Sequence, residues 1–144
     1  MATAKKAPAK KKKGGIVVRG KRKEAIARAA IRKGKGVVRV NHQRLETMAN
    51  RYARELIAEP LRVAPEVAAE VDIDVYIVGG GAMGQAQAAR LSIARALCEY
   101  SGAPEVREKM MARDRFLLAE DSRRVEPKKY LGPKARARFQ KSYR

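Results

Sequence analysis

Residues 71–97 read VDIDVYIVGGGAMGQAQAARLSIARAL, and this stretch decides the fold. In its first half, apolar and polar residues alternate, which predicts a β-strand with one buried and one open face. After the glycines, apolar residues recur at the spacing of a helix that packs on a core. The buried strand positions are Val71, Ile73, Val75 and Ile77, and the helical ones are Ala86, Ala89, Ile93, Ala96, Leu97 and Tyr100. The stretch therefore predicts a strand, a glycine turn and a helix in succession.

The glycines in GGGAMG, residues 79–84, have the G-x-G-x-x-G spacing of a dinucleotide-binding fingerprint. The first strand of a dinucleotide-binding fold is usually buried on both faces. Here Asp72 and Asp74 place two carboxylates on one face of the strand. The acid that should follow about 20 residues later is approximated only by Glu99, which falls inside the predicted helix. We therefore predict that this stretch binds no dinucleotide.

The glycines do not form a phosphate-binding loop either, because Gln85-Ala86 replaces the lysine and hydroxyl residue that such a loop requires. Successive glycines instead permit positive φ angles and let another backbone approach closely. The N–H groups at the start of the following helix can bind an anion, and in a basic protein this anion can be an RNA phosphate. We therefore expect a structural turn close to RNA, formed by Gly79, Gly80, Gly81, Gly84 and Gln85.

Positive charge is concentrated at the two ends of the chain, whose 144 residues carry a net charge of +19. Residues 1–23 contain ten Lys or Arg and no acid, residues 24–121 carry only +1, and residues 122–144 carry +8. Segregation of this kind indicates a polyanionic partner, nucleic acid above all. We predict a disordered basic arm at 1–15, a globular domain at 16–121 and an extended basic tail at 122–144.

The other elements are predicted from periodicity and breaking residues. The alternation in EAIARAAIR, residues 24–32, favours a strand, although its alanine content also suits a helix. The turn residues at 33–36 and a second strand at 37–40 would make a hairpin. A helical period begins at Leu45 and is expected to end at Pro60. Gly102 should end the helix that follows the glycines, and a short helix should run from 104 to about 111.

Catalytic, metal-binding and membrane functions are not indicated. His42 and Cys98 are the single residues of their types, so one chain can form neither a histidine-based metal cluster nor a disulfide. Asp72 and Asp74 are more simply explained as an exposed strand face, or as partners of nearby arginines, than as a catalytic pair. No apolar run approaches the ~20 residues that span a bilayer. We predict a protein that is not an enzyme, with no cofactor, no metal and no membrane partner.

Four motifs resemble those of one family. They are GKRKEAIARA at 20–29, EPL at 59–61, GGGAMGQAQAARLSIARAL at 79–97 and EPKKYLGPKARARFQKSYR at 126–144. In this order and spacing they resemble the universal small-subunit ribosomal protein nine family over about residues 16–144. The DIDV run and the ending QKSYR look like the archaeal and eukaryotic branch. The resemblance implies an α+β fold with a two-layer mixed sheet, helices on one face and a left-handed βαβ crossover.

The resemblance also implies a structural constituent of the small ribosomal subunit in the cytoplasm. Its partners would be ribosomal RNA of the subunit head, neighbouring ribosomal proteins and the transfer RNA in the peptidyl site, without a homo-oligomer. Expected ribosomal RNA contacts are Lys21, Arg22, Lys23, Arg123, Arg124, Lys128, Lys129, Tyr130, Lys134, Arg136, Arg138, Phe139 and Gln140. The residues expected near transfer RNA are Lys141, Ser142, Tyr143 and Arg144, and Tyr143 stands where bacterial members carry a lysine.

The chemistry of the tail agrees with such a function. Its lysines and arginines can neutralise phosphates along an extended path, and its aromatic rings can stack on bases or sugars. Charge alone leaves two alternatives, a general chromatin-like nucleic-acid-binding protein and, less favoured, a small nucleotide-binding enzyme. Association with the small ribosomal subunit, with DNA only, or with a free nucleotide separates the three.

Overall fold

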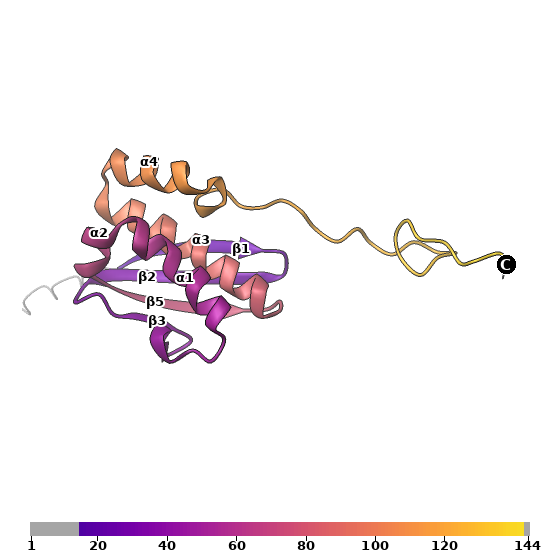
Figure 1. The fold of residues 1–144 in the computed structure, drawn as a ribbon, viewed down its shortest axis with the longest axis horizontal. Coiled ribbons are helices and arrows are strands. Elements are labelled where there is room, and N and C mark those ends of the chain that lie inside the picture. The colour runs from indigo at the N-terminus through magenta and orange to yellow at the C-terminus, as the bar shows by residue number, and fades with distance from the viewer. Residues whose placement is uncertain (1–14, 143–144) are drawn as a thin grey trace, which may run out of the picture.

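The computed structural model describes residues 15–142, so the predicted arm at 1–15 lies almost wholly outside the described residues. Within this range, five strands and four α-helices follow one another in an α+β order (Figure 1). The strands are β1 (Ile16–Arg22), β2 (Ala25–Lys33), β3 (Val38–Val40), β4 (Gln43–Arg44) and β5 (Val71–Val78). The helices are α1 (Arg51–Val63), α2 (Pro65–Ala69), α3 (Ala82–Ser101) and α4 (Pro104–Arg113), with 3-10 turns η1 (Leu45–Thr47) and η2 (Arg115–Leu117).

The strands form one mixed sheet in the order β1-β2-β5-β3-β4. β1 pairs with β2, β2 with β5, and β3 with β4, all antiparallel. β3 and β5 are parallel, and the chain between them passes through α1 and α2. A parallel pair needs such a crossover, because its strands cannot be joined by a tight turn. The predicted mixed sheet is confirmed.

The helices cover one face of the sheet and make the second layer (Figure 1). Alternate residues of β2 and β5 are buried, as the period of two requires. In the register of the sheet, Ala27 lies opposite Ile77 and Ala29 opposite Val75, and all four are buried. The two alanines are small and let α3 lie close to β2, and Leu97 of α3 is fully buried in the core. The residues between them lie on the opposite face, which no helix of the described residues covers.

The predicted hairpin across residues 33–36 is wrong in its pairing, although both of its strands exist. β2 makes its hairpin with β1, and β5 lies between β2 and β3. The carboxylate of Asp72 in β5 accepts hydrogen bonds from the backbone N–H of Lys35 (2.9 Å) and Val37 (3.0 Å). These hydrogen bonds, above all the one from Lys35, hold the pKa of Asp72 below its ordinary value. The turn is therefore fixed to β5, which separates the two strands.

The helix predicted from Leu45 to Pro60 is wrong at both ends. Leu45 begins a 3-10 turn, and α1 begins only after Asn50, whose side chain accepts a hydrogen bond from the Ala53 N–H at 3.1 Å. Such an N-cap satisfies an N–H that the first helical turn leaves free. Pro60 lies inside α1, which continues to Val63. The proline ring is fully buried, and this burial compensates for the one hydrogen bond that it removes.

The later predictions agree better with the structure. α3 ends at Gly102, which has a φ of 62° and caps the helix in the left-handed region. α4 begins at Pro104, as predicted, and ends two residues beyond the expected Met111. No helix in the described part of the chain is both long and apolar enough to cross a membrane. From residue 118 to residue 142 the chain forms neither helix nor strand, and Figure 1 shows it leaving the sheet as an extended segment.

Candidate nucleic-acid interface

The glycine turn between β5 and α3 lies against the turn between β1 and β2. Gly79 and Gly80 have φ angles of 75° and 66°, which residues other than glycine rarely adopt. A Cβ atom on Gly79 would stand 2.5 Å from the carbonyl oxygen of Glu24. The side-chain amide of Gln85 donates to the Gly79 carbonyl at 3.1 Å and closes the turn. The backbone that approaches these glycines is thus the protein's own, at Glu24 and Ala25.

Arg22 joins three segments of the chain at this end of the sheet. Its Nε donates to the side-chain oxygen of Gln87 in α3 at 2.7 Å. One terminal nitrogen lies 3.0 Å from a carboxylate oxygen of Asp121, and the other donates to the carbonyl of Arg123 at 3.2 Å. The Arg22 side chain is only 13% exposed. The guanidinium is therefore committed to the protein and fixes where residues 121–123 leave the sheet.

Asp121 is the anionic centre of this junction. Arg123 donates to it from its backbone N–H at 2.9 Å and from its guanidinium at 2.7 Å. These hydrogen bonds, that of the Arg123 side chain most of all, lower the pKa of Asp121 to about 2. Arg124 then donates to the Lys23 carbonyl at 3.4 Å. The predicted contact residues Arg22, Lys23, Arg123 and Arg124 are thus brought together, with a carboxylate between them.

A second contact holds the segment just before this junction. Arg95 of α3 donates to the carbonyl of Leu118 at 2.9 Å and to that of Arg19 in β1 at 3.0 Å. It also lies 3.3 Å from the carboxylate of Glu120. One guanidinium therefore connects α3, β1 and the beginning of the tail. The tail departs from a fixed position beside the β1–β2 turn.

Beneath the junction, a buried cation joins the helices. Arg90 of α3 lies 2.7 Å from a carboxylate oxygen of Glu59 in α1 and 2.7 Å from one of Asp114. Burial alone would raise the pKa of Asp114, but hydrogen bonds from the Phe116 N–H and from Arg90 outweigh burial and keep it below its ordinary value. A hollow of about 210 Å³ between Arg90 and Arg22 opens beside these groups. Arg90 is thus structural, and it supports the base of the tail.

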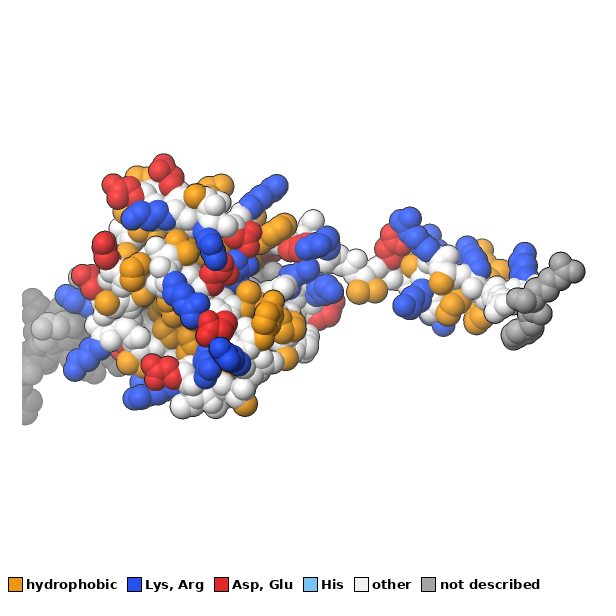
Figure 2. Space-filling model, in the orientation of Figure 1, with side chains coloured by type: hydrophobic (Ala, Val, Ile, Leu, Met, Phe, Trp, Pro, Cys, Tyr) orange, Lys and Arg blue, Asp and Glu red, His pale blue; other side chains and the backbone are white. Residues whose placement is uncertain are grey.

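The tail itself, residues 122–142, exposes cations and aromatic rings. Figure 2 shows Lys and Arg side chains along it, with hydrophobic side chains between them. Tyr130 is 85% exposed and Phe139 is 66% exposed, although both are large aromatic residues. Exposed rings of this size forgo the free energy of burying apolar surface unless a partner covers them. The tail therefore presents a surface that is suited to an extended polyanion with stacking faces.

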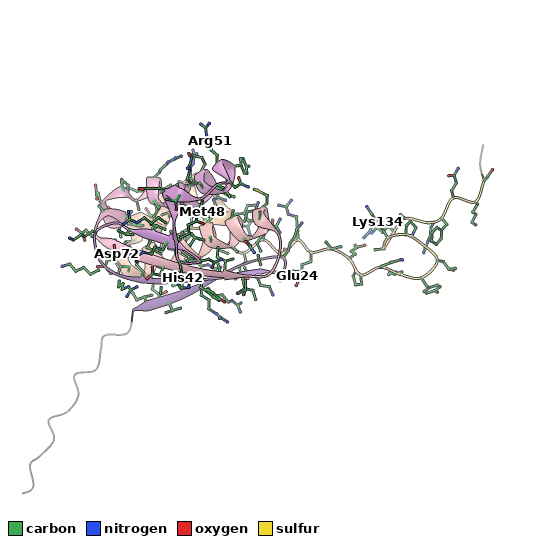
Figure 3. All side chains as sticks on the ribbon, turned by 90° about the horizontal axis from the view of Figure 1, so that it is seen from below. Glu24, His42, Met48, Arg51, Asp72 and Lys134 are labelled. Carbon is green, nitrogen blue, oxygen red and sulfur yellow. The ribbon has the colours of Figure 1, made fainter. Side chains whose placement is uncertain are left out.

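Only part of the tail's charge is neutralised by the protein. Arg136 donates to both carboxylate oxygens of Glu126, at 2.9 and 2.7 Å, and this pair closes a loop in the tail. Arg138 donates to the Tyr130 carbonyl at 3.1 Å. Across residues 15–142, none of the tail lysines forms an ion pair. These are Lys128, Lys129, Lys134 and Lys141, and Figure 3 labels Lys134 on the loop.

The sequence did not identify every residue that organises this interface. Asp121, Gln87 and Arg95 were missed, although they determine where the tail leaves. Asp121 is the last acid before the basic run, which is a weak signal in the sequence. No periodicity shows which polar residue of a helix faces a segment far along the chain. Tyr143 and Arg144 lie outside the described residues, and the described Lys141, Ser142 and Gln140 lie at the far end of the tail.

In the range 15–142, no cluster of three or more His, Cys, Asp or Glu side chains has the arrangement of a metal site. Burial raises the pKa of the Cys98 thiol, so the group is a poorer nucleophile than an exposed thiol.

A small α+β domain that anchors an extended cationic and aromatic tail defines a structural polyanion-binding protein. The family model described as ribosomal protein S9/S16 matches residues 20–144. The chain belongs to this family, whose members are structural constituents of the small ribosomal subunit and not enzymes. The resemblance drawn from the four motifs is thereby confirmed.

Two relatives illustrate the match. The small ribosomal subunit protein uS9 of Methanothrix thermoacetophila is 46% identical over 125 residues, which cover 87% of this chain and 95% of that protein. The protein of the same name from Halobacterium salinarum is 47% identical over 126 residues, which cover 87% of this chain and 96% of that protein. Both organisms are archaea, which agrees with the branch indicated by the DIDV run and the QKSYR ending.

Proposed function

We propose that this protein binds ribosomal RNA of the small-subunit head through its tail and its β1–β2 turn. The observation that carries the proposal is the tail between residues 122 and 142, which is extended, cationic and aromatic and has a fixed point of departure. Because it has no helix or strand of its own, its order depends on a partner. A phosphate backbone supplies the charge that the tail lacks, and RNA bases supply faces for its rings.

The contacts fall into two groups. Arg22, Arg123 and Arg136 are engaged with carboxylates, so they position the chain and add a hydrogen bond to RNA only through their remaining donors. Six other cations of the tail carry no such pair within the described residues. They are Arg124, Lys128, Lys129, Lys134, Arg138 and Lys141. Six phosphate contacts give a salt slope of roughly −4 to −5 in log K against log salt concentration.

The end of the tail has a separate function in this proposal. Lys141, Ser142, Tyr143 and Arg144 lie near the transfer RNA in the peptidyl site, with Arg144 providing charge and Tyr143 a ring or hydroxyl. The glycine turn and the first N–H groups of α3 lie close to RNA at the opposite end of the interface, since Gly81 caps the helix without a side-chain bond. Neighbouring ribosomal proteins of the head complete the surroundings, and the protein acts in the cytoplasm as a single copy per subunit.

The first test is the particle with which the native protein travels. We expect it to sediment with the small subunit at a salt concentration that removes loosely bound basic proteins. Recovery only on DNA would support the chromatin-like alternative, and saturable nucleotide binding by the isolated chain would support the enzyme alternative. Either result would refute the ribosomal function proposed for this chain.

The second test concerns the tail end. Removing residues 141–144 should leave subunit assembly intact and weaken the binding of transfer RNA to the peptidyl site. The matched control neutralises two exposed cations of α4, with Arg107→Gln and Lys109→Gln, which the proposal places outside the interface. Filter binding of transfer RNA to purified subunits measures the effect. Unchanged binding after the deletion would contradict the placement of the tail end.

A further inference from the structure

No element within residues 15–142 covers the face of the sheet opposite the helices. Figure 3 shows the helices on one side of the sheet and side chains projecting from the other side. On β1 this face carries the exposed Val17 and Arg19, on β2 Arg28, and on β5 Tyr76. Val17 is 63% exposed and Tyr76 is 53% exposed. The open face therefore combines apolar, aromatic and cationic side chains, which is unusual for a surface that meets only water.

Two arginines lie side by side on this face, and neither has a counter-ion within residues 15–142. Arg19 lies directly opposite Arg28 in the β1–β2 register, and Arg28 lies directly opposite Tyr76 in the β2–β5 register. Like charges at opposite positions of neighbouring strands destabilise a sheet. Neither arginine forms an ion pair with any group in residues 15–142. A bound anion would remove this repulsion.

The other arginines of the same face are arranged differently. Arg32 and Arg39 both pair with Asp74, which lies between them on β5. The prediction that these carboxylates pair with nearby arginines holds for Asp74, whereas Asp72 accepts hydrogen bonds from the backbone N–H groups of Lys35 and Val37 instead. Among the arginines that β1, β2 and β5 place on this face, only Arg19 and Arg28 are therefore left without a carboxylate in residues 15–142, and Tyr76 lies beside them.

A shallow hollow lies beside this row. It has a volume of about 570 Å³, and its lining includes Arg28, Tyr76, Arg39 and the exposed His42. Asn41 fixes one wall, because its side chain accepts from the Ile77 N–H at 2.8 Å and donates to the Ile77 carbonyl at 3.3 Å. The hollow thus has a rigid edge, a cationic side and an aromatic surface.

We propose that this open face is a second RNA-binding surface of the protein, on which Arg19 and Arg28 bind a backbone phosphate and Tyr76 stacks on a base. The inference rests on the ribosomal RNA-binding function proposed above and assigns to that function a surface separate from the tail. Paired guanidinium groups match the geometry of a phosphate. A tyrosine ring beside them offers a stacking face for an unpaired base.

Continuity with the tail junction favours RNA over an acidic protein as the occupant. Lys21 follows Val17 and Arg19 on the same face of β1, one position from Arg22. A cationic track therefore runs from the open face to the β1–β2 turn and to the point where the tail departs. A single polyanion can follow this track, whereas an acidic peptide on the sheet would leave the stacking face of Tyr76 without a use.

Directed hydroxyl-radical probing tests the location. Full-length protein carrying Cys98→Ala receives one new thiol for an iron chelate, at Val17→Cys on the open face, Tyr52→Cys on α1, or Leu131→Cys in the tail. All three positions are well exposed, at 63%, 66% and 73%. In small subunits reassembled with each protein, we expect cleavage of ribosomal RNA from positions 17 and 131 and much weaker cleavage from position 52.

The outcomes separate this inference from the proposed function. Cleavage from position 131 without cleavage from position 17 refutes the second surface and leaves the tail function intact. The same result together with protection of the thiol at position 17 from a maleimide would mean that a protein covers the face. Absence of cleavage from all three positions would instead contradict the ribosomal RNA function itself.

Binding measurements test the chemistry. The double variant Arg19→Gln/Arg28→Gln should keep or improve folding stability, because it removes a like-charge pair. Its salt slope with small-subunit ribosomal RNA should decrease by about 0.7–0.9, as expected when the one phosphate that the two arginines share is no longer neutralised. Tyr76→Ala should weaken binding without changing the slope, and Tyr76→Phe should restore it. The control Arg32→Gln, on the same face but paired with Asp74, should change the slope much less. An unchanged slope in the double variant overturns the inference.

Discussion

Replacing Gly20 with alanine tests the closest contact between the sheet and α3. Gly20 lies in β1 beneath α3, and an added Cβ atom would stand 2.7 Å from the backbone N of Ser92 and even nearer to the carbonyl oxygen of Ala88. Ordinary contact begins at 3.4 Å, so the strand and the helix would have to separate by ~0.7 Å or more. Both neighbouring atoms belong to the helix backbone, which cannot move aside as a flexible side chain can.

The magnitude follows from the cost of inserting a methyl group into a packed interior, which is about 1–3 kcal/mol. We expect Gly20→Ala to lower the free energy of unfolding by about 2 kcal/mol. With a urea m-value of about 1.5 kcal/mol/M, the unfolding midpoint would fall by roughly 1.3 M. Circular dichroism of α3 and the other helices follows the transition in urea.

The matched control is the same chemical change at Gly84, inside α3. There the added Cβ would lie 3.7 Å from the Ala25 side chain and 3.7 Å from the Arg22 carbonyl, which is ordinary contact. Alanine is a better helix former than glycine, so Gly84→Ala should stabilise the protein by up to ~1 kcal/mol. If both variants have the stability of the parent protein, the close packing of β1 on α3 is not the constraint inferred here.

Three further predictions concern single interactions. The folded-state pKa of Asp121 is about 2, below an unfolded value of ~3.9. Its contribution to stability is therefore present above pH ~4 and is lost as the pH falls toward 2. A carboxyl NMR titration of Asp121 with a midpoint near 4 would contradict the hydrogen bonds of the junction. Arg90→Ala should lower the free energy of unfolding by about 1.5–3 kcal/mol, because it removes charged hydrogen bonds to Glu59 and Asp114. The control Arg62→Gln loses only an exposed ion pair with Glu55, so it should change the free energy of unfolding by less than ~1 kcal/mol in the same urea assay. Asn41→Gly permits the positive φ of 47° but loses both hydrogen bonds to Ile77, so it should lower the free energy of unfolding by about 1–2 kcal/mol. The control His42→Gly should change the free energy of unfolding by no more than ~0.5 kcal/mol. Equal effects of the two variants would refute the conclusion that the Asn41 side chain fixes one wall of the hollow on the open face.

The sequence by itself determined the elements whose signals are local. The alternation at 71–77 requires a strand with one buried face, and the stripe from Ala86 to Tyr100 requires a helix against that face. Gly102 ends the helix because its positive φ suits glycine, and this depends on one residue and its neighbours. The segregation of charge also needs no fold, and it predicted the kind of partner before any contact was known.

Only the tertiary structure decided which segments meet. Sequence periodicity gives no information about strand order. Because β5 lies between β2 and β3, these two strands do not form the expected hairpin. Pro60 remains inside a helix because burial of its ring outweighs a local rule. The junction around Arg22 joins side chains 65 residues apart at Gln87 and reaches the Arg123 carbonyl 101 residues away. Such contacts are selected by the free energy of burying and pairing distant groups, so they exist only once the sheet and α3 have brought those groups together.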